Sequence, residues 1–218
     1  MRHSPTTLVK VENLNISTPR GRHLFLDLNA EISHDHIAMI GRNGVGKTTL
    51  LEILSGKVAR SEVVLNTQPY LVPQDLPDSS RTIRFARKHL TKAELASAGL
   101  HSKLLSQNAC SPGEQRRLQL LVARKAQPEL LILDEPTSDL DEQGMDWLSD
   151  WLSNWSRGLV LVSHSHLLLR QFQHFFVIAE SGCRYLAGGF KEVERFFDEE
   201  ALRTINGHWS CFKCNPNI

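Results

Sequence analysis

The strongest constraint on this chain is the run Gly-Arg-Asn-Gly-Val-Gly-Lys-Thr at residues 41–48. An apolar stretch at 36–40 precedes it and predicts a buried strand, while 48–54 predicts a helix that Gly56 is placed to end. A glycine-rich turn between a strand and a helix directs backbone N–H groups at an anion, and the helix N-terminus adds positive partial charge. The run therefore predicts a phosphate-binding loop within an α/β domain.

The residue types of this loop also predict what each part contacts. Lys47 is expected to reach the β- and γ-phosphates of a nucleotide, and the Thr48 hydroxyl is expected to hold a magnesium ion. The alternative is a glycine-rich turn without a ligand, but so long a pattern seldom arises by chance in 218 residues. The residues of this segment expected to contact the nucleotide are Gly41, Arg42, Asn43, Gly44, Val45, Gly46, Lys47, Thr48 and Thr49.

Length and composition are those of an ordinary globular protein. With 218 residues, of which 41% are hydrophobic and 22% charged, the chain is long enough for one domain or two small lobes. A net charge of +1 gives no global field that favours nucleic acid or an anionic membrane, although a local basic face remains possible. The apolar runs are too short to cross a bilayer and the N-terminus has no apolar signal segment, so we expect a cytoplasmic protein without direct membrane insertion.

Four cysteines are present, and only Cys211 and Cys214 form a C-x-x-C pair. A structural zinc site usually takes four ligands; His208 offers a third, and no fourth is evident nearby. Reduced thiols without a metal are therefore the favoured interpretation.

The apolar pattern predicts a mostly parallel sheet preceded by antiparallel strands. Segments 8–16 and 24–32 alternate apolar and polar residues around Gly21, which predicts an antiparallel pair. Further on, apolar runs alternate with helical patterns, as is typical of a parallel sheet covered on both faces. The other expected strands are 36–40, 63–65, 70–72, 130–133 and 159–162, with a hairpin of 175–179 and 184–187. The expected helices are 48–54, 79–105, 118–126, 141–154, 166–171 and 192–202.

Two carboxylates, Asp134 and Glu135, directly follow the apolar run at 130–133. In open α/β sheets ligands bind at the carboxyl ends of strands, which is also where the phosphate loop lies. Asp134 is thus expected to orient the magnesium shell, and Glu135 to polarise a water in line with the γ-phosphate. The alternative is that both carboxylates only solvate the strand end, and the nearby loop disfavours it.

Further motifs follow in an order that resembles the ATP-binding cassette (ABC) ATPases, over nearly the whole chain. Residues 110–117, Cys-Ser-Pro-Gly-Glu-Gln-Arg-Arg, resemble that family's signature, and 136–141, Pro-Thr-Ser-Asp-Leu-Asp, resemble its D-loop. Gln74 stands where the family has its Q-loop glutamine, and His164 where it has the switch histidine. The resemblance implies a P-loop NTPase cassette with a small helical subdomain at about 76–127. The cassette is expected to span 1–204, followed by a C-terminal tail at 205–218 that is expected to be disordered.

The resemblance also implies cofactors, partners and roles. ATP and Mg²⁺ are the expected cofactors, with Thr48, Gln74 and Asp134 at the metal, and Glu135, His164 and Gln74 in catalysis. Ser111 and Gly113 would contact the γ-phosphate held by a second ABC cassette, in a homodimer or a separate chain. Two ATP molecules would then lie between head-to-tail cassettes.

The signature and the base site depart from the family pattern. Pro112 replaces the first signature glycine and removes a phosphate donor, unless this proline is the first residue of a helix. Glu114 replaces glutamine, which is a mild change. The family's adenine-stacking aromatic is absent from 17–19, and His23 or Phe25 are weak candidates to replace it.

The closest resemblance is to the ABC-F branch, through the motifs above and the stretch at 185–193. Those proteins are soluble, carry two cassettes and mostly act on ribosomes, so the chain is interpreted as an N-terminal half of such a protein, naturally short or truncated. The space between Gln74 and Ser111 leaves no room for the arm that many first cassettes insert in the helical lobe. Two alternatives stay open: the ATPase subunit of a membrane permease, and an ATP-gated scaffold without turnover.

Two other patterns favour ordinary structural roles. Trp147, Trp151 and Trp155 recur at helical spacing, which favours a core or subunit-facing helix over a base-stacking platform. The cations that could touch RNA phosphates, although a solvated helix face is favoured, are Arg84, Arg87, Lys88, Arg116 and Arg117.

Overall fold

A computed structural model describes residues 7–17, 21, 23–76, 79–107, 110–179 and 182–205. The antiparallel strands β1 (Val9–Ser17) and β2 (His23–Ile32) form a three-stranded sheet with β4 (Val63–Leu65), in the order β2-β1-β4. The pairing of β1 with β2 confirms the prediction from the alternating pattern. The partnership of β1 with the distant β4 was not predicted, because three residues carry no pairing signal of their own.

A second sheet has six strands in the order β5-β6-β7-β3-β8-β9. Its first five strands run parallel, and β9 closes it as an antiparallel hairpin with β8. The carboxyl ends of three adjacent strands lie close together: Asp134, the end of β6, pairs with Val162, the end of β7, and Val162 pairs with Met39 near the end of β3. The strands are β3 (His36–Gly41), β5 (Tyr70–Val72), β6 (Leu130–Asp134), β7 (Gly158–Val162), β8 (His174–Ala179) and β9 (Gly182–Ala187).

Both faces of the six-stranded sheet are covered, which explains the continuous apolar runs in its strands. Alternate residues point to opposite cores: Ile132 and Val160 pack with α1 (Lys47–Leu54) and the three-stranded sheet, whereas Leu131 and Leu159 pack on the opposite face. That opposite face is covered by α6 (Glu142–Ser153), α7 (His166–Leu169) and α8 (Phe190–Ile205). The predicted mostly parallel sheet with N-terminal antiparallel strands is confirmed.

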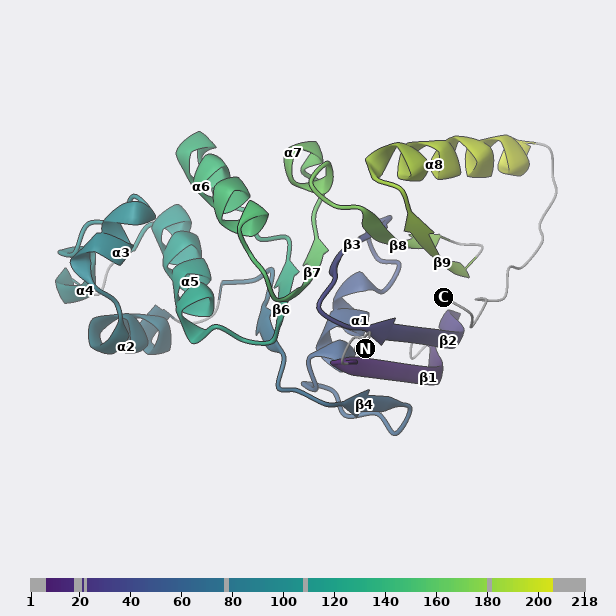
Figure 1. Cartoon of the computed structure of the whole chain (residues 1–218), viewed down its shortest axis with the longest axis horizontal. Coiled ribbons are helices and arrows are strands. Elements are labelled where there is room, and N and C mark those ends of the chain that lie inside the picture. The colour runs from purple at the N-terminus through teal and green to yellow at the C-terminus, as the bar shows by residue number, and fades with distance from the viewer. Residues whose placement is uncertain are drawn as a thin grey trace, which may run out of the picture.

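A lobe of four helices lies at the end of the molecule opposite α8 (Figure 1). The segment predicted as helical at 79–105 divides into three helices, and these pack against α5 around a separate apolar cluster that includes Ile83, Leu95 and Leu118. Trp147 of α6 contacts both this cluster and the sheet core. The four helices are α2 (Ser79–His89), α3 (Lys92–Ser97), α4 (Leu104–Gln107) and α5 (Pro112–Ala126).

The tryptophan stripe is part of the core, as favoured from the sequence. Trp151 and Trp155 are buried and Trp147 is half-buried, so none forms an open stacking platform. None of the helices in the described ranges has the length and apolar character that a membrane crossing requires. The predicted tail, including Cys211 and Cys214, lies outside the described residues except for Ile205.

Candidate nucleotide site

The predicted phosphate loop connects the end of β3 to the start of α1, and its shape depends on glycine. Gly44 and Gly46 have φ angles of +76° and +110°, a region that side-chain-bearing residues rarely adopt. A Cβ at Gly41 would lie 2.5 Å from the Ile178 carbonyl oxygen, so β8 leaves no room for a side chain there. Gly46 precedes the first helical residue, as an anion site at a helix N-terminus requires.

Lys47 is buried, and its amine lies inside the loop. The Nζ atom donates hydrogen bonds to the carbonyl oxygens of Gly41, at 2.7 Å, and of Arg42, at 3.2 Å. Burial lowers the pKa of this amine, and the charges of Glu135 and Asp134 oppose that shift. The amine is therefore held by neutral carbonyls that an anionic phosphate oxygen would outcompete.

Asp134 and Thr48 connect the second predicted strand to the loop. The Thr48 hydroxyl donates a 2.9 Å hydrogen bond to Asp134 Oδ2, although 86 residues separate them in the chain. Thr48 is the second residue of α1, which follows β3, and Asp134 is the last residue of β6. Only β7 lies between β6 and β3 in the sheet, so the strand order brings Thr48 and Asp134 together. Thr48 is exposed while Asp134 is buried, so an ion would approach from the Thr48 side.

Glu135 and His164 form a second pair beside the first. Glu135 has a φ of +45°, and its N–H donates to the Val162 carbonyl oxygen at 2.9 Å, so the backbone turns sharply just past β6. Its Oε1 lies 3.3 Å from His164 Nε2. This is an ion-pair distance without hydrogen-bond geometry, and Oε1 is buried without a hydrogen-bond partner in the described structure. The His164 side chain is 59% exposed.

Burial raises the pKa of both carboxyls. For Asp134 the Thr48 hydrogen bond and the Lys47 charge act against burial, and for Glu135 the His164 contact does so. Both shifts mean that the folded protein disfavours the two negative charges as they stand. A dication is the natural compensation, and hydroxyl and carboxylate oxygens are the donors that Mg²⁺ prefers. Thr48 and Asp134 therefore fit a magnesium ion.

The predicted signature residues begin α5 in the helical lobe. Ser111 is the N-cap, and its hydroxyl accepts a 3.3 Å hydrogen bond from the Glu114 N–H. In return, the Glu114 carboxylate accepts hydrogen bonds from the Ser111 N–H at 2.8 Å and from the Ser111 hydroxyl at 2.9 Å. Pro112 occupies the first helical turn, so its missing N–H is one that the helix leaves unpaired anyway. The proline is therefore the first residue of a helix, where it costs the helix no hydrogen bond. Gly113 packs on the Asp139 carbonyl oxygen, which would lie 2.6 Å from an added Cβ.

Gln74 is exposed and follows β5, and a buried arginine holds its backbone. Arg116 of α5 is 0% exposed. Its Nη1 donates hydrogen bonds to the Pro73 carbonyl oxygen at 2.8 Å and to Gln119 Oε1 at 2.9 Å. Its Nη2 donates to the Gln74 carbonyl oxygen. The guanidinium thus ties the signature helix to the segment after β5. The favoured interpretation of Arg116 as part of a solvated face was wrong.

Comparison with known proteins agrees with this geometry. A family model described as "ABC transporter" matches residues 25–97. The ATP-binding protein Uup of Caulobacter vibrioides is 33% identical over 169 residues, covering 72% of this chain and 28% of Uup. The chain is an ABC-type cassette, most like a single cassette of the ABC-F family. The F family member 4 of Arabidopsis thaliana is 28% identical over 200 residues, 78% of this chain and 27% of that protein.

The cassette thus spans about a third or less of the length of these curated relatives. Among solved structures, cbiO1 from Clostridium perfringens, part of the transporter complex cbiONQ, superposes with a TM-score of 0.65. It is 24% identical, and the match covers 92% of this chain and 94% of cbiO1. This likeness shows the fold.

Of the two residues suggested for the adenine base, Phe25 does not offer a stacking surface. Phe25 is 2% exposed, and its ring packs on Gly46 in the core, where an added Cβ would lie 3.1 Å from it. His23 is exposed, but its Nδ1 bonds the Ser17 hydroxyl at 2.9 Å. The suggestion that Phe25 replaces the family's aromatic was therefore wrong, since the ring is needed beneath the phosphate loop.

The raised pKa of Asp134 predicts that this residue weakens the metal-free fold. A carboxyl whose folded pKa lies above its unfolded value loses stability as pH rises through that interval, and the loss persists at neutral pH. Asp134→Asn keeps an acceptor for Thr48 but carries no charge. The melting temperature of the metal-free protein should therefore rise by a few degrees, since each kcal/mol gained in unfolding free energy raises it by about 2–4 °C. Calorimetric melting in chelator checks this, with the exposed Asp146→Asn as control.

Added Mg²⁺ and ATP should then raise the melting temperature of the wild type more than that of Asp134→Asn. A lower melting temperature for Asp134→Asn in chelator would contradict the electrostatic account of this carboxylate.

Proposed function

We propose that the cassette binds Mg-ATP and hydrolyses it when two cassettes close head to tail. The observation that carries this proposal is the convergence of the phosphate loop with two acidic residues from a different strand: Thr48 bonds Asp134 at 2.9 Å, and Glu135 lies 3.3 Å from His164. In this proposal the cassette spans residues 1–204, with the helical lobe at about 76–127.

The phosphates would bind where the loop N–H groups and Lys47 converge. A γ-phosphate oxygen would draw the Lys47 amine from the Gly41 and Arg42 carbonyls, because a charge-assisted hydrogen bond is stronger than a neutral one. Thr48, Asp134 and Gln74 would hold Mg²⁺, which when bound neutralises charge on the phosphate oxygens. The other members of the phosphate site are Gly41, Arg42, Asn43, Gly44, Val45, Gly46 and Thr49.

Glu135 would orient and polarise the attacking water. Its buried, unpartnered Oε1 is free to accept a proton or a hydrogen bond, and its raised pKa makes it a better base than an exposed glutamate. His164 lies within reach of that oxygen and is mostly exposed, so it can contact both Glu135 and the γ-phosphate. Gln74 would report the state of this site to the helical lobe through Arg116.

Ser111 and Gly113 would complete the site of the second cassette. They lie at the N-terminus of α5, a 15-residue helix whose N–H groups favour an anion. Ser111 is exposed, and within the described chain its hydroxyl bonds only the capping Glu114. A surface of this kind is suited to a phosphate supplied by another copy.

Phosphate release by the purified protein tests this proposal. Because each site needs residues of two cassettes, the specific rate per cassette should rise with protein concentration and reach a plateau once pairs predominate. Release that depends on Mg²⁺ and rises in this way supports paired hydrolysis. ATP binding without release at any concentration supports the ATP-gated scaffold and contradicts hydrolysis.

For the cellular role we propose a translation-associated, ribosome-linked activity. It rests on the likeness to ABC-F proteins such as the Arabidopsis thaliana F family member. Affinity purification of a Glu135→Gln variant from cell lysate in ATP tests it: ribosomal subunits in the eluate support the role. A polytopic membrane protein in their place would identify a permease partner and overturn the ribosomal proposal.

A further inference from the structure

Charge is unevenly distributed between the helical lobe and the rest of the cassette. Residues 79–107, which hold three of the four helices of the lobe, contain six lysines and arginines against one glutamate, a net charge of +5. The whole chain has a net charge of +1, so the remainder carries −4. The near-neutral charge of the whole chain therefore includes a strongly basic helical lobe. This is the local basic face that the net charge alone left possible.

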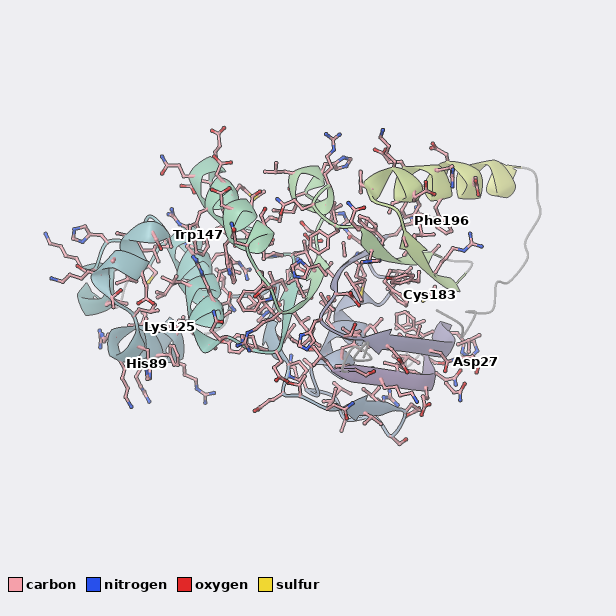
Figure 2. All side chains as sticks on the ribbon, viewed as in Figure 1. Asp27, His89, Lys125, Trp147, Cys183 and Phe196 are labelled. Carbon is pink, nitrogen blue, oxygen red and sulfur yellow. The ribbon has the colours of Figure 1, made fainter. Side chains whose placement is uncertain are left out.

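The cations of α2 lie on one face of that helix. Arg81, Arg84 and Lys88 are spaced i, i+3 and i+7, opposite Ile83 and Ala86, which are buried in the lobe core. All three cations are exposed, and we call them the α2 stripe. Nitrogen-tipped side chains project outward around α2 in Figure 2, on the side where His89 is labelled.

The α2 stripe has no acidic partner among the described residues. Among the described residues, none of the ion pairs involves Arg81, Arg84 or Lys88. Glu94 is the one acidic residue of 79–107, and its carboxylate is bonded to Lys125 at 2.7 Å and to the N-cap Thr91. The stripe is thus a positive surface without an internal partner in the described part of the chain.

The surroundings of the stripe favour a nucleic acid over a protein or a membrane. Protein interfaces have an apolar or aromatic centre that is poor in charge, and membrane-surface helices expose large apolar residues. The large hydrophobic residues found exposed in the described structure all lie outside the helical lobe: Leu26, Val58, Val64, Leu65 and Leu167. A polar and strongly positive surface is the usual form of a phosphate-backbone contact.

The spacing of the stripe also suits a phosphate backbone. At 1.5 Å of rise per residue, Arg81 and Lys88 lie about 10 Å apart along the helix axis. One strand of a duplex carries about three phosphates over that length. We propose that the α2 stripe docks the helical lobe on the phosphate backbone of RNA. The choice of RNA rests on the ribosome-linked role proposed above, whereas the phosphate contact rests on the charges alone.

Binding of a fluorescent RNA hairpin with a stem of about 16 base pairs tests this inference. The full chain, without nucleotide, is titrated at several salt concentrations. Neutralising the stripe (Arg81→Gln, Arg84→Gln and Lys88→Gln together) should weaken binding at least about tenfold and reduce the slope of log K against log salt by about 2–3. A control triple changes the same residue types at exposed positions elsewhere: Arg60→Gln, Arg170→Gln and Lys191→Gln.

The control triple should keep the wild-type affinity within about twofold. Equal losses in the two triples, or no binding by the wild type at low salt, would overturn the inference. The inference would also be overturned if a poly-glutamate peptide or phosphatidylglycerol vesicles bound through the stripe as tightly as RNA or more tightly. Binding of a DNA duplex more than tenfold tighter than RNA would overturn it as well. The triple variant of the stripe should hydrolyse ATP at the wild-type rate. Because RNA binding is measured without nucleotide, the test remains valid even if the protein does not hydrolyse ATP.

Discussion

Glu135→Gln is expected to lower ATP turnover by about a hundredfold or more, while ATP affinity changes by less than about twofold. The glutamine keeps the size and the polarity of the side chain but cannot take a proton from water. Glu135 is the carboxylate whose Oε1 is buried, unpartnered and close to His164, so it is the one placed to act as base. Phosphate release under saturating Mg-ATP, with binding measured by calorimetry, checks both parts.

Glu129→Gln is the matched control for that substitution. Glu129 is exposed and immediately precedes β6, so it lies at the opposite end of the strand that delivers Asp134. Its replacement should leave turnover unchanged. Turnover by Glu135→Gln equal to that of the wild type would remove Glu135 from the catalytic role, and a parallel loss of ATP binding would indicate damage to the site.

The second large effect is expected at Arg116. Replacement by methionine leaves three acceptors without their donor, namely the part-buried carbonyl oxygens of Pro73 and Gln74 and the buried side-chain oxygen of Gln119. Each such loss costs about 1–3 kcal/mol, partly offset because a desolvated charge is also removed, so the free energy of unfolding should fall by about 2–4 kcal/mol. Urea denaturation measures this directly.

A conservative variant separates stability from function at the same position. Arg116→Lys keeps the charge but cannot bond two carbonyls as a fork, so turnover should fall more than ATP affinity does. Arg195→Met is the control, since that side chain is 68% exposed and, among the described residues, bonds only Glu192, which predicts a change below about 0.5 kcal/mol. If Arg116→Lys is as active as the wild type, the link from α5 to Gln74 has no part in turnover.

The parts of the fold that local pattern dictates were predictable. The phosphate loop needs glycines at fixed offsets before a helix, and Asp134 and Glu135 needed only a buried strand before them. Their meeting follows from a parallel sheet, whose carboxyl ends align. Most element bounds agree within a few residues, as β5 (Tyr70–Val72) and β6 (Leu130–Asp134) illustrate.

Side-chain surroundings were less predictable, because tertiary packing decides them. Arg116 was interpreted as solvated on account of its charge, but it shares a helical face with Leu120 and Ala123, both fully buried. That periodicity was the available signal, and it gave no sign of the Pro73 and Gln74 carbonyls. Phe25 is similar: only the folded β2 shows that its ring supports the phosphate loop.

Titration calorimetry with Mg-ATP tests the central claim most directly, namely that the glycine loop and the Asp134 carboxylate together bind a magnesium-bound triphosphate. The wild type should bind ATP with one site per chain, and chelating the magnesium should weaken that binding. Lys47→Ala should abolish the signal or weaken it by at least about a hundredfold, since a charged contact to phosphate is lost. Absence of ATP binding by the folded wild type, or undiminished binding by Lys47→Ala, would contradict the account.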